Sequence, residues 1–262
     1  MRVDDPRGAG GPQASYALTL RPARPDFTAR LNSAPASVAQ GSGQAFSVAV
    51  ERYDGFEDAV EVEFLHLPAG WSVSHPVKIE AGHESATLTL NAAAGTTQPD
   101  DAAWDAVRVV ASAKAEGRSI ALAVNNLGRP RLAAEPAKLL VSLEPYGGST
   151  NASEATVFIR PGGTATARLR LKRNGFEGVV VFSIDNLPHG VIVENLGLNG
   201  ITFLADENER EISFAAAKWV SELDRPFHAV ENQAGRQTSQ PLALLVRRPR
   251  STPAADPKAT LK

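Results

Sequence analysis

The sequence predicts an all-β protein built from two tandem β-sandwich domains. Three observations support this fold class: a long segment is repeated, short stretches alternate apolar and polar residues, and almost no stretch shows helical periodicity. The repeat is clearest in GFEDAVEVEFLHLPAG at positions 55–70 and GFEGVVVFSIDNLPHG at positions 175–190. Because each copy carries its own alternating apolar set, we expect two separate cores.

Each copy reads as a series of antiparallel strands. Before the shared motif, QAFSVAVER and TATARLRLKR alternate with period two and end in a basic residue, and the first copy carries one extra residue, Tyr53, before the turn. The dipeptides Asp54-Gly55 and Asn174-Gly175 follow, and they predict hairpin turns because these residues accept a left-handed backbone at low cost. A second alternating run then ends at Leu-Pro-x-Gly, in which proline fixes its own φ and glycine supplies a positive φ.

Further runs complete about seven or eight short strands per copy, which is typical of an immunoglobulin-like sandwich. The first strands are expected at 16–20 (YALTL) and 139–143 (LLVSL), and helical turns are possible at 100–104 and 218–223. The Gly- and Pro-containing stretch 125–138 reads as a linker that packs against the domains and joins the two sandwiches in line.

These runs give the expected domain boundaries. We predict a flexible N-terminal segment at 1–14, a first sandwich at 15–128, a second at 129–248 and a flexible tail at 249–262. The tail contains a small basic cluster in a Pro-rich context, which favours a solvated terminus.

The series G-F-x-x-x-V, L-P-x-G-W/V and T-L-T-L-N-A resembles the immunoglobulin-like repeats of secreted bacterial proteins. These repeats include sandwich modules appended to extracellular glycosidases and modules found beside pre-peptidase C-terminal domains. The likeness covers about Tyr16 to Val246, although the second copy has Val191 where the first has Trp71. It implies a non-catalytic, extracytoplasmic sandwich (secreted, periplasmic or at the cell surface) used as a spacer, adhesion or protein-docking module. The family shares no catalytic residues that could be carried over.

The composition of the chain limits the classes of partner that it can bind. A formal net charge of −2 over 262 residues gives no field that would attract nucleic acid, and no apolar run is long enough for membrane insertion. The chain has no cysteine, so disulfides and thiolate metal sites are excluded. Its start lacks a secretion signal, and we therefore expect it to be part of a longer exported chain or assembly whose partner is an unknown protein or a cell-surface glycan.

No catalytic motif is found, and we predict no catalytic residue, no cofactor and no metal ligand. The histidines do not pair at ligand spacing on a single predicted element. The acidic loops near Asp101 and Glu207 lack the spacing of a calcium loop, which favours solvated turns, although calcium there stays open.

The aromatic residues suggest the main alternative function, which is that of a carbohydrate-binding accessory module of a secreted enzyme. The candidate binding residues are Tyr53, Trp104 and Trp219. Both tryptophans follow corresponding alanine-rich strands, which favours rings that cover one end of a core, whereas Tyr53 has no repeat partner and is expected to be exposed. A chaperone-like binder of the pilus-assembly type would share the fold and remains a third alternative.

Overall fold

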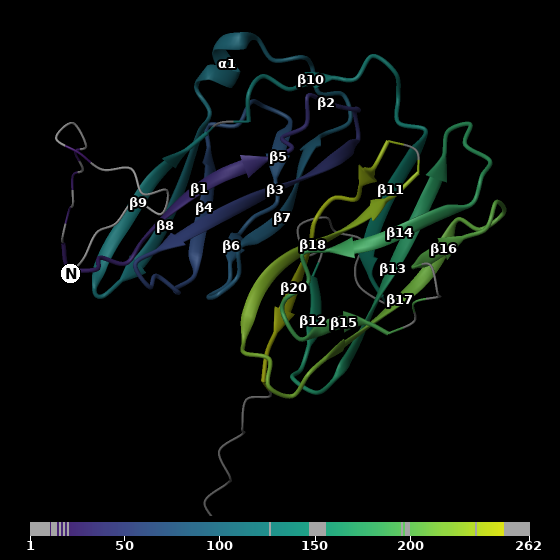
Figure 1. The fold of residues 1–262 in the computed structure, drawn as a ribbon. Coiled ribbons are helices and arrows are strands. Elements are labelled where there is room, and N and C mark those ends of the chain that lie inside the picture. Colours follow the sequence, from purple (N-terminus) through teal and green to yellow (C-terminus); the bar gives the residue numbers. More distant parts are fainter. Residues whose placement is uncertain are drawn as a thin grey trace, which may run out of the picture.

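The computed structural model describes residues 21–125, 127–146, 156–194, 200–233 and 235–248, together with Gly11, Ser15, Ala17, Thr19 and Leu196. The regular secondary structure of the described residues is strand apart from one short helix, so the predicted fold class is confirmed: the chain is a tandem of immunoglobulin-like β-sandwiches (Figure 1). Apart from Gly11, the expected flexible ends at 1–14 and 249–262 lie outside the described residues.

The first sandwich, purple to teal in Figure 1, consists of two antiparallel four-stranded arrangements. In one, the order is β1 (Asp26–Asn32), β3 (Ser42–Tyr53), β7 (Ser85–Ala92) and β5 (Trp71–Val73). In the other, it is β6 (Val77–Ile79), β4 (Val60–Leu65), β8 (Arg108–Ala115) and β9 (Arg118–Val124).

The second sandwich, coloured from teal through green to yellow, repeats this order. One sheet runs β11 (Leu139–Pro145), β13 (Thr164–Arg173), β17 (Glu209–Ala216) and β15 (Val191–Val193). The other runs β16 (Ile201–Phe203), β14 (Val180–Asp185), β18 (Leu223–Glu231), β20 (Leu242–Val246) and β12 (Thr156–Ile159), and β12 is parallel to β20.

The predicted linker is packed, as its apolar content indicated. Within it, β10 (Arg131–Leu132) pairs in parallel with β2 (Ser37–Val38) of the first sandwich. Leu127 belongs to the first core, and Ala137 is also buried.

The buried apolar residues form two clusters, one for each copy of the repeat. The first extends from Phe27 to Leu127 and the second from Leu139 to Val246. The alternation seen in the sequence produces this result, because every second side chain of a strand points to the same face. The hydrophobic interiors are therefore separate, as expected.

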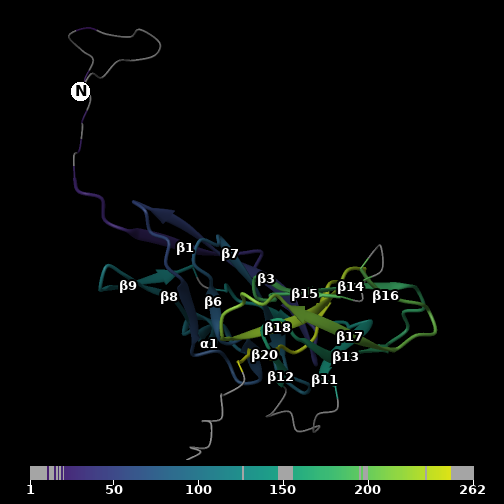
Figure 2. The same ribbon diagram turned by 90° about the horizontal axis from the view of Figure 1, so that it is seen from below.

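The backbone, in contrast, is continuous between the sandwiches. A two-residue strand, β19 (Gln237–Thr238), pairs with β18 on one side and with β3 on the other. One sheet thus runs from the second sandwich into the first, and the two lie side by side in both views (Figures 1 and 2). The expected in-line arrangement is therefore wrong, because β19 and β3 connect the sandwiches in addition to the linker and hold them side by side.

The Asp-Gly and Asn-Gly turns are not hairpins. The strands on either side, β3 and β4 in the first copy and β13 and β14 in the second, belong to opposite sheets of each sandwich. The turn therefore carries the chain across the top of the core. Residues Asp54 and Gly55 have φ values of 52° and 80°, so the left-handed backbone that the sequence suggested is present in a different connection.

The Leu-Pro-x-Gly corners have the same geometry in both copies. The amide of Trp71 donates to the carbonyl of Pro68 at 3.0 Å, and the amide of Val191 donates to the carbonyl of Pro188 at 3.0 Å. His66 and Asn186, which precede the two motifs, have positive φ values of 60° and 66°. These two residues therefore occupy equivalent positions in the two copies, and each adopts a left-handed backbone.

The basic residue that ends the strand before each turn has a structural role. The guanidinium of Arg52 donates to the carbonyl oxygens of Asp58, Glu80 and His83 at 2.6 to 3.2 Å. In the second copy, Arg173 donates in the same way to the carbonyls of Phe176, Gly178, Leu204 and Glu207. We call these two arginines the carbonyl clamps.

Two element predictions need correction and one is confirmed. Among the described residues the first strand is β1 at Asp26–Asn32. Of the strand expected at 16–20, Tyr16, Leu18 and Leu20 lie outside the described residues, and Ala17 and Thr19 are exposed and outside strands. Helix α1 (Asp101–Asp105) confirms the first helical turn, with Asp100 as its N-cap. No helix forms at 218–223: Lys218 and Trp219 make a turn after β17, and Leu223 already belongs to β18.

Candidate functional site

The junction between the sandwiches is polar and buried. Beside the β19–β3 pairing, the hydroxyl of Ser42 donates to Oε1 of Gln237 at 2.6 Å, and the hydroxyl of Thr238 donates to Oγ1 of Thr89 at 3.0 Å. The exposed fraction of all four side chains is 8% or less. Because buried hydroxyls and amides need partners, these bonds fix one relative position of the two sheets.

Gly43 makes this approach possible. A Cβ atom on Gly43 would lie 2.2 Å from Oδ1 of Asn91 and 2.3 Å from Oγ1 of Thr238. Neither contact is sterically possible, so any side chain at this position would push β19 away from β3.

An ion pair crosses the junction beside β6. The guanidinium of Arg225 contacts the carboxylate of Glu80 and also donates to Oδ1 of Asn186 at 2.9 Å. The side chains of Arg225 and Glu80 are 11% and 25% exposed. Burial lowers the pKa of Arg225, while Glu80 acts in the opposite direction.

His228 is buried on the face of β18 opposite Phe227 and Ala229, which lie in the second core. On that side β18 lies against β6 and β7 of the first sandwich. Neither ring nitrogen of His228 has a hydrogen-bond partner among the described residues. Burial lowers the pKa of His228 to about 4, with Asp185 on the neighbouring strand acting in the opposite direction, so the ring is neutral at pH 7.

At the edge of this junction is a hollow of about 420 Å³, which we call the cleft. Residues of both sandwiches line it. A row of three rings runs along one side: the ring centroids of His83 and His189 are 5.5 Å apart, and those of His189 and Trp219 are 5.0 Å apart. His83 comes from the first copy, whereas His189 and Trp219 come from the second, so the ring row exists only because the sandwiches are docked.

The three candidate binding residues lie in three different environments. Trp104 is 1% exposed and packs edge-to-face against Trp71 with ring centroids 4.9 Å apart, so it covers the first core and offers no face to a ligand. Trp219 is 60% exposed in the cleft. Tyr53 is 40% exposed at the end of β3, beside Thr28 and outside the cleft.

The expected equivalence of Trp104 and Trp219 is wrong for a local reason. Trp104 lies on α1, which has no counterpart in the described part of the second copy. Trp219 instead lies over the second Leu-Pro-x-Gly corner, where a Cβ on Gly190 would be 2.5 Å from its Cη2 atom.

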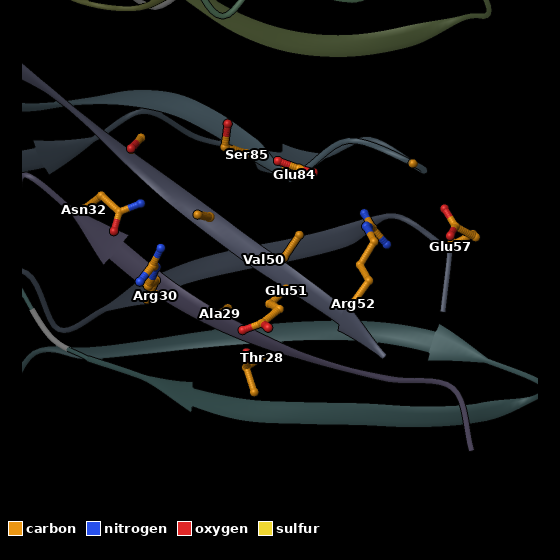
Figure 3. A pocket seen from close by; sticks show the side chains of 13 residues that line it. Thr28, Ala29, Arg30, Asn32, Val50, Glu51, Arg52, Glu57, Glu84 and Ser85 are labelled. Atoms are coloured by element: carbon orange, nitrogen blue, oxygen red, sulfur yellow. The ribbon is translucent and has the colours of Figure 1, made fainter. Parts of the chain in front are cut away.

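A second, larger hollow of about 730 Å³ lies on the outer face of β1 and β3 (Figure 3). Asn32 lies at one end, and Arg52 and Glu57 lie at the other. Arg52 is one of the carbonyl clamps, and the remaining lining consists of Arg, Glu, Ser, Thr, Ala, Val and Gly residues. None of the described residues that line this hollow is aromatic, so they offer no stacking surface.

The acidic loops are occupied by protein contacts. Asp101 and Asp105 both pair with Arg129 at 2.7 Å, and Glu207 pairs with Arg210 at 2.8 Å while accepting from the amide of Leu204. Among the described residues, no three His, Asp or Glu side chains are grouped so that they could hold a metal ion. In the same part of the chain, no helix is long and apolar enough to cross a membrane.

Sequence reasoning missed the residues that build the junction and the cleft. His189 occupies the variable position of the second Leu-Pro-x-Gly motif, and Arg225 and Glu80 belong to no motif. Nothing in the sequence of either copy indicates which surfaces of the two sandwiches meet. A usable signal was the repeat itself: QAGRQTS at 233–239 is longer than the matching turn of the first copy, Glu116-Gly117, and this extra length contains β19.

No protein-family model matches the chain, and no curated protein matches it. Solved structures similar to it include a protein of unknown function from Porphyromonas gingivalis, at 12% identity over 84% of this chain and 99% of that one, with a TM-score of 0.28. Domains 5–6 of the S-layer protein SbsC match at 13% identity over 85% and 98% with a TM-score of 0.25. Tandem immunoglobulin domains of titin match at 8% over 85% and 96% with a TM-score of 0.25. Likenesses at these scores carry no information about partner or activity.

Proposed function

We propose that this chain is a non-catalytic, extracytoplasmic module that acts as a spacer, adhesion or protein-docking unit, and that its two sandwiches hold one fixed orientation. Residues 15–128 and 129–248 are the two domains of this unit, which belongs to a longer chain or assembly. The proposal of an extracytoplasmic location is based on the resemblance to repeats of secreted proteins.

The observation that carries the proposal is the continuous sheet through β19 and β3. Tandem domains joined only by a linker move relative to each other unless their interface is extensive and well packed. Here the backbone pairing, the buried hydroxyl bonds and the Arg225–Glu80 ion pair all cross the junction. A unit of this kind transmits position and force from one end to the other, which is the task of a spacer or docking module.

A measurement of the distance between the two sandwiches tests the fixed orientation on which this function depends. The chain has no cysteine, so Ser119→Cys on β9 and Glu177→Cys in the second copy, both exposed, introduce a unique pair of spin-label sites. Double electron–electron resonance is expected to give one narrow distance distribution. A broad or bimodal distribution would refute the fixed orientation, and the same pair in a Gly43→Leu background serves as the broadened control.

A second candidate function, a carbohydrate-binding accessory module, is favoured by one observation. Trp219 presents 60% of its surface beside a hollow, which is the arrangement required for stacking on a sugar ring. Screening the protein against a glycan array tests this function, with binding that depends on Trp219 as the expected outcome.

A further inference from the structure

We infer that the cleft between the sandwiches is a binding site for one neutral pyranose ring, which stacks on Trp219 and is held by polar groups from both sandwiches. This inference deepens the second candidate function and relies on the docked arrangement of the two sandwiches. It names a site, a ligand class and the residues of each sandwich that contribute.

The indole of Trp219 is held in place while remaining open on one side. One edge of the ring lies over Gly190, where the φ of 85° and the absence of a side chain both require glycine. The imidazole of His189 lies beside it with ring centroids 5.0 Å apart. A ring that is fixed before binding loses little entropy when a ligand stacks on it, which favours binding.

The volume and lining suit a small ligand that carries hydroxyl groups. About 420 Å³ lies within the range of small-molecule sites, and such sites occur preferentially at domain interfaces. Around the ring row the lining offers the ammonium of Lys78 from the first copy and the hydroxyl of Ser221 and carboxylate of Glu222 from the second. These groups supply both donors and acceptors, which is the pattern that sugar hydroxyls need.

The charges in the cleft point to a neutral sugar. Arg225 is paired with Glu80, and Asp224 is paired with Arg247. The Lys and Glu side chains of the lining outside these two ion pairs are Lys78 and Glu222, and their charges are opposite. An anionic sugar would meet no excess of positive charge, so the cleft gives it no advantage.

Tryptophan fluorescence tests the site directly. The chain has three tryptophans, and Trp71 and Trp104 are 5% and 1% exposed, so collisional quenching by acrylamide reports mainly on Trp219. The probes are methyl glycosides of glucose, galactose, mannose and N-acetylglucosamine and the corresponding neutral disaccharides and trisaccharides, with sialylated and uronate-containing glycans as the acidic series.

We expect at least one neutral glycan to protect Trp219 from acrylamide, with binding measured by calorimetry. Trp219→Ala is expected to weaken this binding at least tenfold, Trp219→Phe to retain part of it, and Tyr53→Ala, which removes an exposed ring outside the cleft, to leave it unchanged. Protection by none of the neutral glycans, binding of acidic glycans alone, or equal binding by Trp219→Ala would each overturn the inference.

The two proposals fail in distinguishable ways. Trp219→Ala should leave the distance between the spin labels unchanged, because this side chain makes no bond across β19 and β3. A narrow distance without glycan binding would refute only the sugar site. Glycan binding with a broad distance distribution would refute the fixed orientation.

Discussion

The hydroxyl oxygens of Thr89 and Thr238 lie 3.0 Å apart in a buried hydrogen bond, although 149 residues separate them in the chain. Thr89 is on the face of β7 that points away from the first core, between Leu88 and Leu90, which point into it. A polar residue on such a face is normally exposed, and here the second sandwich covers it. The bond therefore marks the surface on which one sandwich is docked onto the other.

Gly43→Ala should weaken the junction without affecting either core. The added Cβ would collide with Asn91 and Thr238, and overpacking of this kind costs about 1–3 kcal/mol. We expect calorimetry to resolve two unfolding transitions where the unaltered protein gives one. Ser47→Ala, on the open part of the same strand, is the control and should keep a single transition.

Loss of Arg225 should destabilise the protein much more than loss of an exposed arginine. Removing one partner of a largely buried pair leaves the other charge without compensation, and we expect Arg225→Ala to cost about 3 kcal/mol in the free energy of unfolding. Arg247→Ala removes an exposed ion pair with Asp224 and should have little effect. Denaturant unfolding measures the free energy of unfolding of both variants. Equal losses in Arg225→Ala and Arg247→Ala would contradict the burial of the Arg225–Glu80 pair.

The carbonyl clamps should each stabilise their own sandwich. Arg52→Ala leaves the carbonyls of Glu80 and His83 without a charged donor, and we expect a loss of about 2–3 kcal/mol. In Arg52→Ala, amide hydrogen exchange should become faster in the first sandwich alone. In Arg173→Ala, it should become faster in the second sandwich alone. Arg30→Ala, on the outer face of β1, is the control.

Stability should fall as the solution becomes more acidic than pH 6.5, because of His228. The folded pKa of about 4 lies below the ordinary value of 6.5, so between these values the unfolded chain binds a proton that the folded protein does not. This loss amounts to about 3 kcal/mol by pH 4. His228→Gln should remove this part of the pH dependence of the unfolding midpoint; an unchanged profile in the variant would show that His228 is not buried in its neutral form.

The sequence predicted the parts of the structure that depend on local pattern. Alternation set the strands and both cores, because it fixes which side chains point inward, as for Phe182 and Phe214. The Leu-Pro-x-Gly motif occurs in both copies because both corners need the same backbone conformation.

The junction was not predictable in this way. Gly43, Thr89 and Gln237 are small or polar residues whose partners lie in the other copy, and periodicity carries no information about contacts between domains. The difference between Trp104 and Trp219 was not predictable either, because both follow alanine-rich strands in the sequence, whereas the described part of the second copy has no counterpart of α1.

Residual dipolar couplings of the backbone amides test the central claim most directly, because they report the orientation of each sandwich independently. If β19 and β3 join the two sandwiches into one body, a single alignment tensor will fit the couplings of both, with the relative orientation seen in Figures 1 and 2. Two tensors of different magnitude would contradict the account, since they would require the sandwiches to move independently.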